Sequence, residues 1–337
     1  MTDKITSLDV ARRAGVSQSA VSRVFTPGAS ASTATRDKVM KAAEALGYRP
    51  NTLARAMITG QSRIIGLIVA YLDNQFYPLA LERISRALQD EGYHILVFIS
   101  ENSQNVAAIV EELLAYQVDG IITASVAMSN DLAHRCEAAR IPVVMFNRGQ
   151  DEGQHSQVTS DNVAGGKAVA HFLAAGGHRK IAHIAGWQSS STGRDRTRGF
   201  LAGLSEHGIE PVAVEDGMYD QGTASSIARH LFLGRDRPDA VFVGNDHMAF
   251  AVMDTLRFEL GLSIPGDVSV VGYDDVPIAA WPAYDLTTIR QPINQMISAT
   301  VEALLARIGG DGDPRRILIP GPLKIRGSAR KPKGFTP

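Results

Sequence analysis

The sequence predicts an all-α N-terminal domain followed by an α/β domain of two similar lobes, each built on a doubly wound parallel sheet. Two short amphipathic segments hinged at Gly15 indicate the first part. From residue 63 onward, short apolar runs alternate with amphipathic stretches, as is typical of β-α-β units. A weak internal repeat predicts that the lobes are alike, since residues 63–68 parallel 179–184 and residues 118–123 parallel 238–243.

Residues 6–25 predict a helix-turn-helix. Thr6 and Ser17 are suited to cap the two helices by accepting backbone N–H bonds. Val21 and Val24 mark the apolar stripe of the second helix and leave its other face polar and exposed. In this motif the start of the second helix meets base edges in the major groove of DNA. The predicted base contacts are Gln18, Ser19 and Arg23, and the predicted DNA backbone contacts are Thr6, Ser17, Ser22, Ser32, Tyr48 and Asn51.

The charge distribution also favours DNA binding by this segment. Up to residue 60 the chain has nine Lys or Arg against four Asp or Glu, a net charge of +5. The remainder has 25 basic and 31 acidic residues, a net charge of −6. A basic head on an acidic body is suited to bind a polyphosphate through the head alone.

A third helix is predicted over residues 33–46, with Ser32 as its start and Gly47 as its stop. This helix completes a small three-helix core. A domain of only about 50 residues is marginally stable, because it buries little apolar surface. Residues 51–60 are rich in small side chains and lack a wide apolar stripe, so we interpret them as a linker or a conditional helix.

The following body is predicted from its apolar runs and the helical stretches between them. Because ligands of open α/β sheets bind off the carboxyl ends of the strands, a cleft between the lobes is the predicted binding site. The predicted strands are residues 64–69, 95–99, 120–123, 143–146, 181–185, 240–243 and 268–271, and the predicted helices include residues 79–90, 106–116, 163–174, 197–206 and 248–260.

Composition and motifs argue against several other classes. The longest apolar run, residues 64–72, is too short to span a bilayer, and the N-terminus lacks the apolar core of a signal peptide, so we expect a cytoplasmic protein. The single cysteine, Cys136, has no partner for an internal disulfide and is interpreted as structural. The stretch Gly165-Gly-Lys-Ala lacks the upstream glycine and the hydroxyl of a phosphate-binding loop. No metal-ligand spacing and no nucleophile elbow appears, so we expect neither a metal nor an enzyme.

Several motifs occur in the order typical of one family. In order these are Asp9-Val-Ala, Ala14-Gly-Val-Ser, Val21-Ser-Arg-Val, Leu46-Gly-Tyr-Arg-Pro-Asn, Asp161-Asn, Gly177-His-Arg-Lys-Ile, Arg198-Gly-Phe, Gly244-Asn-Asp-His-Met-Ala, Gly272-Tyr-Asp-Asp and Leu286-Thr-Thr-Ile-Arg-Gln-Pro. With them the chain resembles the lactose-repressor/galactose-repressor (LacI/GalR) family of bacterial transcription regulators nearly end to end.

The resemblance implies a helix-turn-helix headpiece over residues 1–50, a hinge helix or linker over 51–61 and a periplasmic-binding-protein-like body over 62–337. In that body the N-lobe comprises about 62–161 and 290–320, and the C-lobe about 162–289 and 321–337. It implies a homodimeric repressor that reads a near-palindromic DNA operator and responds to a small metabolite bound between the lobes.

The resemblance also implies contact residues. In the hinge, Ala54 permits close approach and Met57 stands at the minor-groove wedge position, where the family usually has leucine. The implied effector contacts are Asn74, Phe76, Tyr77, Arg148, Arg196, Asn245, Asp246, Asp275 and Trp281. These side chains suit a polar, hydroxyl-rich effector such as a sugar, and the two arginines are compatible with a sugar acid. No cofactor is expected.

Two other functions share parts of this pattern. A sugar-binding receptor that serves a transporter has the same two lobes. Such a receptor would be favoured by a secretory signal and by the absence of a DNA-binding head. This sequence instead has a predicted DNA-binding head and no apolar signal-peptide core. An α/β enzyme would need a positioned acid/base pair, for which Asp246 and Asp275 are the candidates. We interpret both acids as hydrogen-bond acceptors for a polyol. Phe76 and Tyr77 could instead pack the start of a helix, and Trp281 could anchor a loop or an interface.

Overall fold

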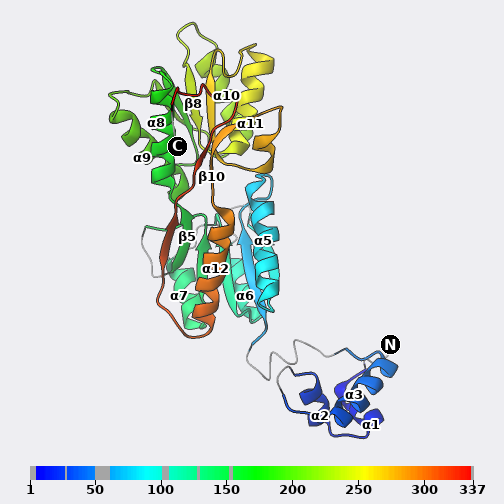
Figure 1. Ribbon diagram of the computed structural model, residues 1–337. Helices are drawn as coiled ribbons and strands as arrows, with labels where there is room; N and C mark the ends of the chain where they lie inside the picture. The colour runs from blue at the N-terminus through cyan, green and yellow to red at the C-terminus, as the bar shows by residue number, and fades with distance from the viewer. Residues whose placement is uncertain are drawn as a thin grey trace. The chain divides into compact units, whose positions relative to one another are not determined.

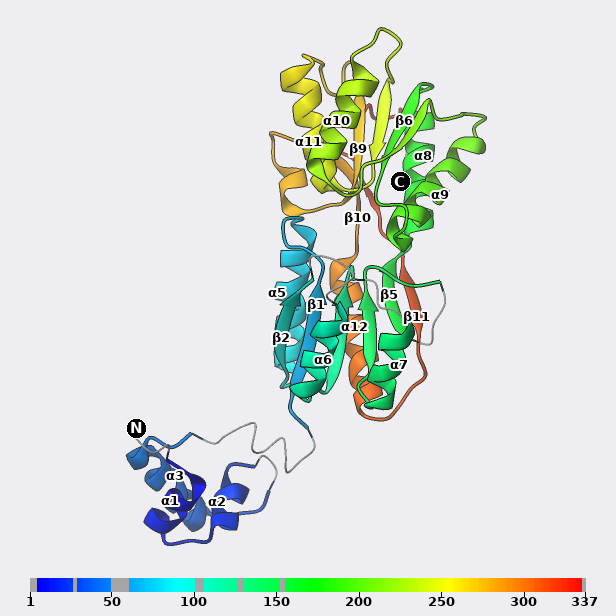
Figure 2. The same cartoon turned by 180° about the vertical axis from the view of Figure 1, so that it is seen from behind.

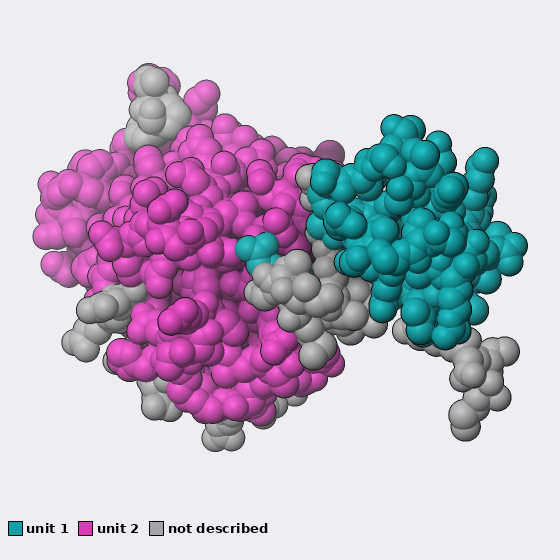
Figure 3. All heavy atoms as spheres, turned by 90° about the horizontal axis from the view of Figure 1, so that it is seen from below, with its two compact units in different colours: residues 1–62 teal, residues 63–337 magenta. Residues whose placement is uncertain are grey.

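The computed structural model describes residues 5–26, 29–49, 61–100, 106–126, 130–151 and 155–334. The chain divides into two compact units, residues 1–62 and 63–337, which are coloured separately in Figure 3. The predicted hinge residues Asn51, Ala54 and Met57 lie outside the described residues. None of the helices in the described ranges is long and apolar enough to cross a membrane.

The described residues of unit 1 form the helices α1 (Ser7–Ala14), α2 (Gln18–Val24) and α3 (Thr33–Leu46). The predicted turn is present, since Gly15 has a φ of 65°, a left-handed conformation that glycine adopts without a steric cost. Their shared core is small, and Val10, Val21 and Val39 are almost fully buried in it. The predicted Ser17 cap forms as well, because its hydroxyl accepts the backbone N–H of Ala20, whereas the hydroxyl of Thr6 donates to Asp9 instead.

Unit 2 contains two sheets of six strands each (Figures 1 and 2). The first has the order β11 (Arg316–Ile319), β5 (Ser156–Ser160), β4 (Val143–Phe146), β3 (Gly120–Ala124), β1 (Ile64–Val69) and β2 (His94–Ile99). The second has the order β12 (Leu323–Lys324), β10 (Thr287–Arg290), β9 (Ser269–Asp274), β8 (Ala240–Val243), β6 (Ile181–Ala185) and β7 (Ala213–Asp216). All pairs are parallel except β10 with β12.

The two sheets repeat one topology, as the internal repeat predicts. Residues 64–68 and 181–184 form β1 and β6, and each of these strands lies between the next strand in sequence and the one after it. In this doubly wound order the ligand crevice opens at the carboxyl ends beside the first and third strands. We call the first sheet with its helices the N-lobe and the second sheet with its helices the C-lobe.

Helices cover both faces of each sheet. In the N-lobe, α5 (Phe76–Asp90) and α12 (Ile293–Ile308) pack on one face, and α6 (Val106–Ala115) and α7 (Asn130–Ala138) pack on the other. In the C-lobe, α10 (Gln221–Phe232) and α11 (Asp246–Asp254) oppose α8 (Asn162–Ala175) and α9 (Ser191–Ser205). A π-helical turn, Thr255–Glu259, extends α11, and a short 3-10 helix spans Pro277–Ala280. Strands β1, β3, β4 and β8 are therefore covered on both sides, which explains their continuous apolar runs.

The chain crosses between the lobes three times, between residues 160 and 162, between 290 and 293, and between 319 and 323. The seven predicted strands are all present, but β5, β7, β10, β11 and β12 were not among the predicted strands. Ser156–Ser160 and Ala213–Asp216 have polar sequences without an apolar run, so their strand conformation depends on pairing with β4 and β6.

Candidate functional site

The outward face of α2 is polar. Gln18, Ser19, Ser22 and Arg23 are all exposed, as the sequence predicts for a DNA-reading helix. Gln18 does not extend freely, because its side-chain amide donates a 2.9 Å hydrogen bond to the hydroxyl of Ser7 in α1. The helix is short but anchored at both ends, by the Ser17 cap and by the packing of Val24.

The predicted backbone contacts lie around this face in different ways. Thr6 is exposed, and both its backbone N–H and its hydroxyl donate to the carboxylate of Asp9. The exposed Ser32 caps α3 by accepting the N–H of Thr35. Tyr48 is half-buried, with its ring 5.8 Å from that of Phe25. These side chains therefore also stabilise the headpiece itself.

In unit 2, several predicted residues meet where strands of both sheets end. Tyr77, at the start of α5, is buried; its hydroxyl contacts the hydroxyl of Ser125 and accepts a 3.0 Å bond from the amide of Asn147. Burial raises the pKa of Tyr77, so its hydroxyl stays protonated. Arg148 follows β4, and its guanidinium lies 5.3 Å from the ring centre of Trp187 in the C-lobe.

The C-lobe contributes Arg196, which is 3% exposed. Its guanidinium donates to the Asn162 side chain at 2.9 Å and to the carbonyl of Gly244 at 2.7 Å. It also lies 3.4 Å from the carboxylate of Asp274 and 3.7 Å over the ring of Tyr273. All of these partners belong to the C-lobe, so Arg196 is held before any ligand arrives.

Asp274 connects the two lobes. It ends β9 with a φ of 124°, a backbone conformation that side chains rarely adopt, and it accepts hydrogen bonds from Gln291 at 2.8 Å and from Asn74 of the N-lobe. Burial raises the pKa of Asp274, whereas Arg196 opposes that rise. A strained, buried acid at the end of a strand is typical of a functional position.

Other predicted effector contacts are engaged elsewhere. Both oxygens of Asp246 are used, since they accept the hydroxyl of Thr288 at 2.6 Å and the N–H of Val276 at 3.0 Å. Burial raises the pKa of Asp246 well above its usual range, and the neighbouring Asp274 adds to this rise. Asn245 caps α11 by accepting the N–H of Met248.

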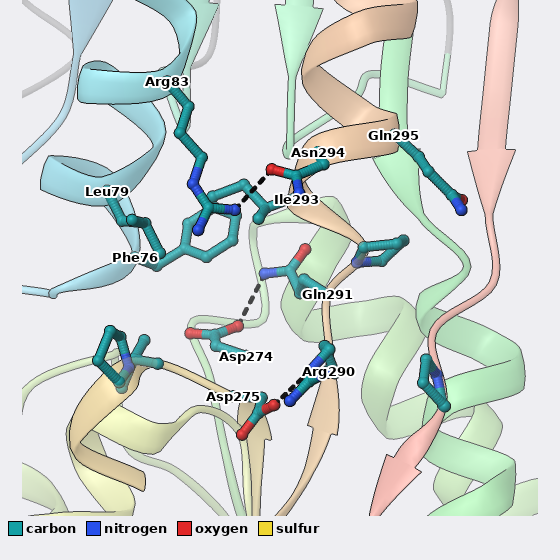
Figure 4. A pocket seen from close by; sticks show the side chains of 14 residues that line it. Phe76, Leu79, Arg83, Asp274, Asp275, Arg290, Gln291, Ile293, Asn294 and Gln295 are labelled. Atoms are coloured by element: carbon teal, nitrogen blue, oxygen red, sulfur yellow. Dashed lines mark hydrogen bonds and ion pairs between the residues drawn. The ribbon is translucent and has the colours of Figure 1, made fainter. Parts of the chain in front are cut away.

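The predicted contact Asp275 is held by two arginines. Its oxygens lie 2.5 Å from Arg290 and 2.5 Å from Arg326, and its side chain is only 3% exposed. Figure 4 shows Asp274 and Asp275 side by side, the first bonded to Gln291 and the second to Arg290. They line a cavity of about 500 Å³ beside two of the crossovers.

Phe76 and Trp281 are apart from the cluster around Arg196. Phe76 is buried, stacks on Phe146 at 6.2 Å and also lines the 500 Å³ cavity. Trp281 is 55% exposed and lines a separate cavity of about 430 Å³, together with Asn74 and His247. The structure thus brings together Asn74, Tyr77, Arg148 and Arg196 from the prediction, and it leaves Trp281 at a different opening.

Sequence reasoning missed five residues of this region: Tyr71, Asn147, Trp187, Tyr219 and Asp274. Tyr71 lies edge-on to Tyr77, with 5.1 Å between the ring centres. Tyr219 donates to the Thr192 hydroxyl at 3.0 Å. Most of the five follow the carboxyl end of a strand by one or two residues, or end it, so the position rule for α/β sheets could have found them. In the described ranges no cluster of His, Cys, Asp or Glu is arranged to hold a metal.

Comparisons with known proteins agree with this architecture. Residues 6–51 match the model for bacterial regulatory proteins of the lacI family, and residues 169–329 match that for a periplasmic-binding-protein-like domain. The chain is 31% identical to the HTH-type transcriptional repressor PurR of Vibrio vulnificus (strain CMCP6), over 96% of this chain and 98% of the relative. This chain belongs to the lacI family of bacterial regulatory proteins.

Two solved structures of family members are similar over nearly the whole chain. One is the Lac repressor dimer bound to operator and the anti-inducer ONPF, with a TM-score of 0.87, 29% identity, and coverage of 97% of this chain and 99% of that one. The other is a complex of the transcriptional regulator CelR with cellobiose, with a TM-score of 0.74, 29% identity, and coverage of 97% and 100%. The chain is a DNA-binding regulator and not an enzyme.

Proposed function

We propose that this chain is a transcriptional repressor that reads a near-palindromic operator with α2 and changes its operator affinity when a small metabolite binds between the lobes. The observation that carries the DNA-binding part is the exposed face of α2, where Gln18, Ser19 and Arg23 stand on a helix fixed by its cap. Thr6, Ser17, Ser22, Ser32, Tyr48 and Asn51 are the proposed DNA backbone contacts, and Ala54 and Met57 the proposed minor-groove contacts.

The proposed effector site is the inter-lobe cleft around Arg196. Asn74, Tyr77 and Arg148 come from the N-lobe, and Asp275 with the adjacent Asp274 are the proposed acids, each already paired with arginine in the free protein. Phe76, Asn245 and Asp246 are proposed to support this site through the contacts described above, and Trp281 stays a proposed contact although it lines a separate cavity. The cellobiose complex of CelR favours a sugar or sugar derivative as the effector class.

We further propose that the chain works as a homodimer in the cytoplasm and associates with the nucleoid when bound to DNA. The dimer of the similar Lac repressor supports the assembly. Exposed apolar side chains in unit 2 also support it, because Phe258 is 81% exposed and Ile99, on the edge strand β2, is 53% exposed.

Selection of DNA fragments from the source genome by the full-length chain tests the repressor function. The expected result is a short list of sites that share an inverted repeat. For the recovered site, Arg23→Ala should lower specific affinity by about 1–3 kcal/mol if Arg23 binds a guanine edge, with less effect on random DNA.

Lys41→Ala is the matched control, because Lys41 is an exposed cation on α3 outside the proposed reading face. We expect it to change specific and random binding equally, by a small amount. Recovery of fragments without a shared site would contradict the proposal, and so would equal losses on specific and random DNA for Arg23→Ala.

A further inference from the structure

The guanidinium of Arg148 is buried without a counter-charge. Arg148 is 7% exposed, and among the described residues no carboxylate forms an ion pair with it. Its Nε is buried without a hydrogen-bond partner. In the described ranges the ring of Trp187 lies next to its guanidinium and the neutral hydroxyls of Tyr71 and Tyr77 lie near it, so none of these neighbours supplies a counter-charge. A cation–π contact offsets only part of the free-energy cost of burying an ion.

The preceding residue leaves a second group unpaired. Asn147 is 3% exposed, and its Nδ2 donates to Tyr77, but its Oδ1 has no hydrogen-bond partner. Asn147 also has a φ of 69°, so the backbone is held in a left-handed conformation where β4 ends. An unpaired acceptor and an unpaired cation thus occupy adjacent positions at the carboxyl end of a strand, where ligands of such sheets bind.

The acids near the cleft are already committed to other groups. Asp274 is bound by Arg196, Gln291 and Asn74, and Asp246 by Thr288 and Val276. At the edge of the cleft, Asp151 pairs with Arg194 at 2.5 Å, and Asp73 lies 3.8 Å from His247. The compensating negative charge for Arg148 must therefore come from outside the described part of the chain.

We propose that the metabolite bound in this cleft is an anion that carries hydroxyl groups. Arg148 binds its carboxylate or phosphate, and one of its hydroxyl groups donates a hydrogen bond to Oδ1 of Asn147. Guanidinium binds either anion through parallel N–H bonds, and the lone pairs of an amide oxygen suit a hydroxyl. This inference rests on the proposed function, because it names the chemical class of the effector for the same cleft.

Calorimetric titration of the full-length chain with matched neutral and anionic probes tests the inference. The neutral probes are glucose, galactose and ribose; the carboxylates are gluconate, glucuronate and galacturonate; the phosphates are glucose and ribose phosphates, all at equal ionic strength. We expect at least one anionic probe to bind tenfold or more tightly than its neutral parent. Whether this probe is a carboxylate or a phosphate identifies the source of the charge.

Three variants separate recognition of charge from a structural role. Arg148→Gln should lower the affinity for the anionic probe tenfold or more and remove the preference over the neutral parent, whereas Arg148→Lys should keep part of that preference. Arg148→Met should not lower the melting temperature of the free protein, because it removes an uncompensated buried charge. Arg194→Met is the matched control, since Arg194 is also an arginine at the cleft but is paired and 40% exposed.

Three results would overturn the inference. One is a neutral sugar that binds as tightly as its acid or phosphate, another is an unchanged anion affinity in Arg148→Gln, and the third is a panel in which no anionic probe binds. These titrations contain no DNA, so their failure is distinct from a failure to recover an operator, which would overturn the repressor function instead.

Discussion

The two lobes each contribute one buried arginine to the proposed effector site, but the two arginines are in opposite states. Arg196 of the C-lobe has a carboxylate, an amide oxygen, a backbone carbonyl and an aromatic face as partners. Arg148 of the N-lobe has no carboxylate partner among the described residues, and its guanidinium lies against the face of Trp187. One arginine is therefore paired in the free protein, and the other has charge and hydrogen-bonding capacity left for a ligand.

This difference teaches that residue type alone does not identify a binding group. Both arginines are buried, and the family resemblance implies both as effector contacts. Only their partners show that Arg196 holds the C-lobe together while Arg148 is available to bind a ligand. A ligand that binds Arg148 connects the N-lobe to C-lobe residues that are already in place. A ligand can shift the arrangement of the lobes only if it binds one arrangement more tightly than the other, and a contact of this kind can supply that difference.

The largest effect is expected from removing the completed arginine. Arg196→Met should lower the free energy of unfolding by about 3–5 kcal/mol, because it leaves Asp274 buried without its cation. Urea unfolding of the full chain measures this. Arg198→Met is the control on the same helix, since the Arg198 side chain is 68% exposed and its ion pair with Asp195 should contribute only about 0–1 kcal/mol. Similar losses in the two variants would refute the contrast between the arginines.

The second largest effect is expected from a buried histidine of the C-lobe, His183. Burial lowers the pKa of His183 from its ordinary 6.5 to about 4, and its ring bonds the carbonyl of Phe242 and the hydroxyl of Thr197. Because the unfolded chain binds the proton more readily, stability is full above pH 6.5 and is lost as the pH falls toward 4. The loss should reach about 3 kcal/mol over this range.

In His183→Gln, the free energy of unfolding should no longer fall by this amount between pH 6.5 and 4. In His230→Gln, at an exposed position of α10, the decrease should be the same as in the wild-type chain. Unfolding by urea at a series of pH values gives the comparison. A parallel pH profile for the wild-type chain and His183→Gln would show that His183 does not control acid stability.

Helix packing offers a third comparison of the lobes. Helices α8 and α9 of the C-lobe touch so closely that a Cβ on Gly199 would collide with the backbone carbonyl of Val163. In the N-lobe a Cβ on Gly66 would meet the movable end of the Leu113 side chain at 2.7 Å. We expect Gly199→Ala to cost about 1–3 kcal/mol and Gly66→Ala less, because backbone yields less readily than a side-chain end. Thermal unfolding of both variants ranks them, and the reverse order would contradict this account.

The smallest effect is expected at the edge of the cleft. The ion pair between Arg194 and Asp151 joins the lobes, but the Asp151 side chain is 78% exposed. Asp151→Asn should therefore change the free energy of unfolding by less than about 1 kcal/mol, and added salt should reduce even that. Unfolding at low and high salt tests it. A loss as large as that of Arg196→Met would mean that the exposed pair, and not the buried pair, holds the lobes together.

Much of the fold was predictable because its signals are local. Apolar runs at 64–69 and 181–185 predict β1 and β6, the corresponding strands of the two lobes, and a glycine at position 15 predicts the turn of the headpiece. The polar strands β5 and β10 carried no such signal, since their conformation follows from neighbours distant in sequence.

Local sequence signals are enough to predict the order of the domains, the repeated lobe and the polar face of α2, because helix caps and hydrophobic periodicity act over a few residues. Only the tertiary structure decided that Asp275 is neutralised by Arg290 and Arg326 while Asp274 lies against Arg196, although the two acids are adjacent in the chain. It likewise decided that Arg148 has no counter-charge among the described residues. Whether a buried charge is compensated depends on side chains from several strands and helices, and no local pattern records which of them meet.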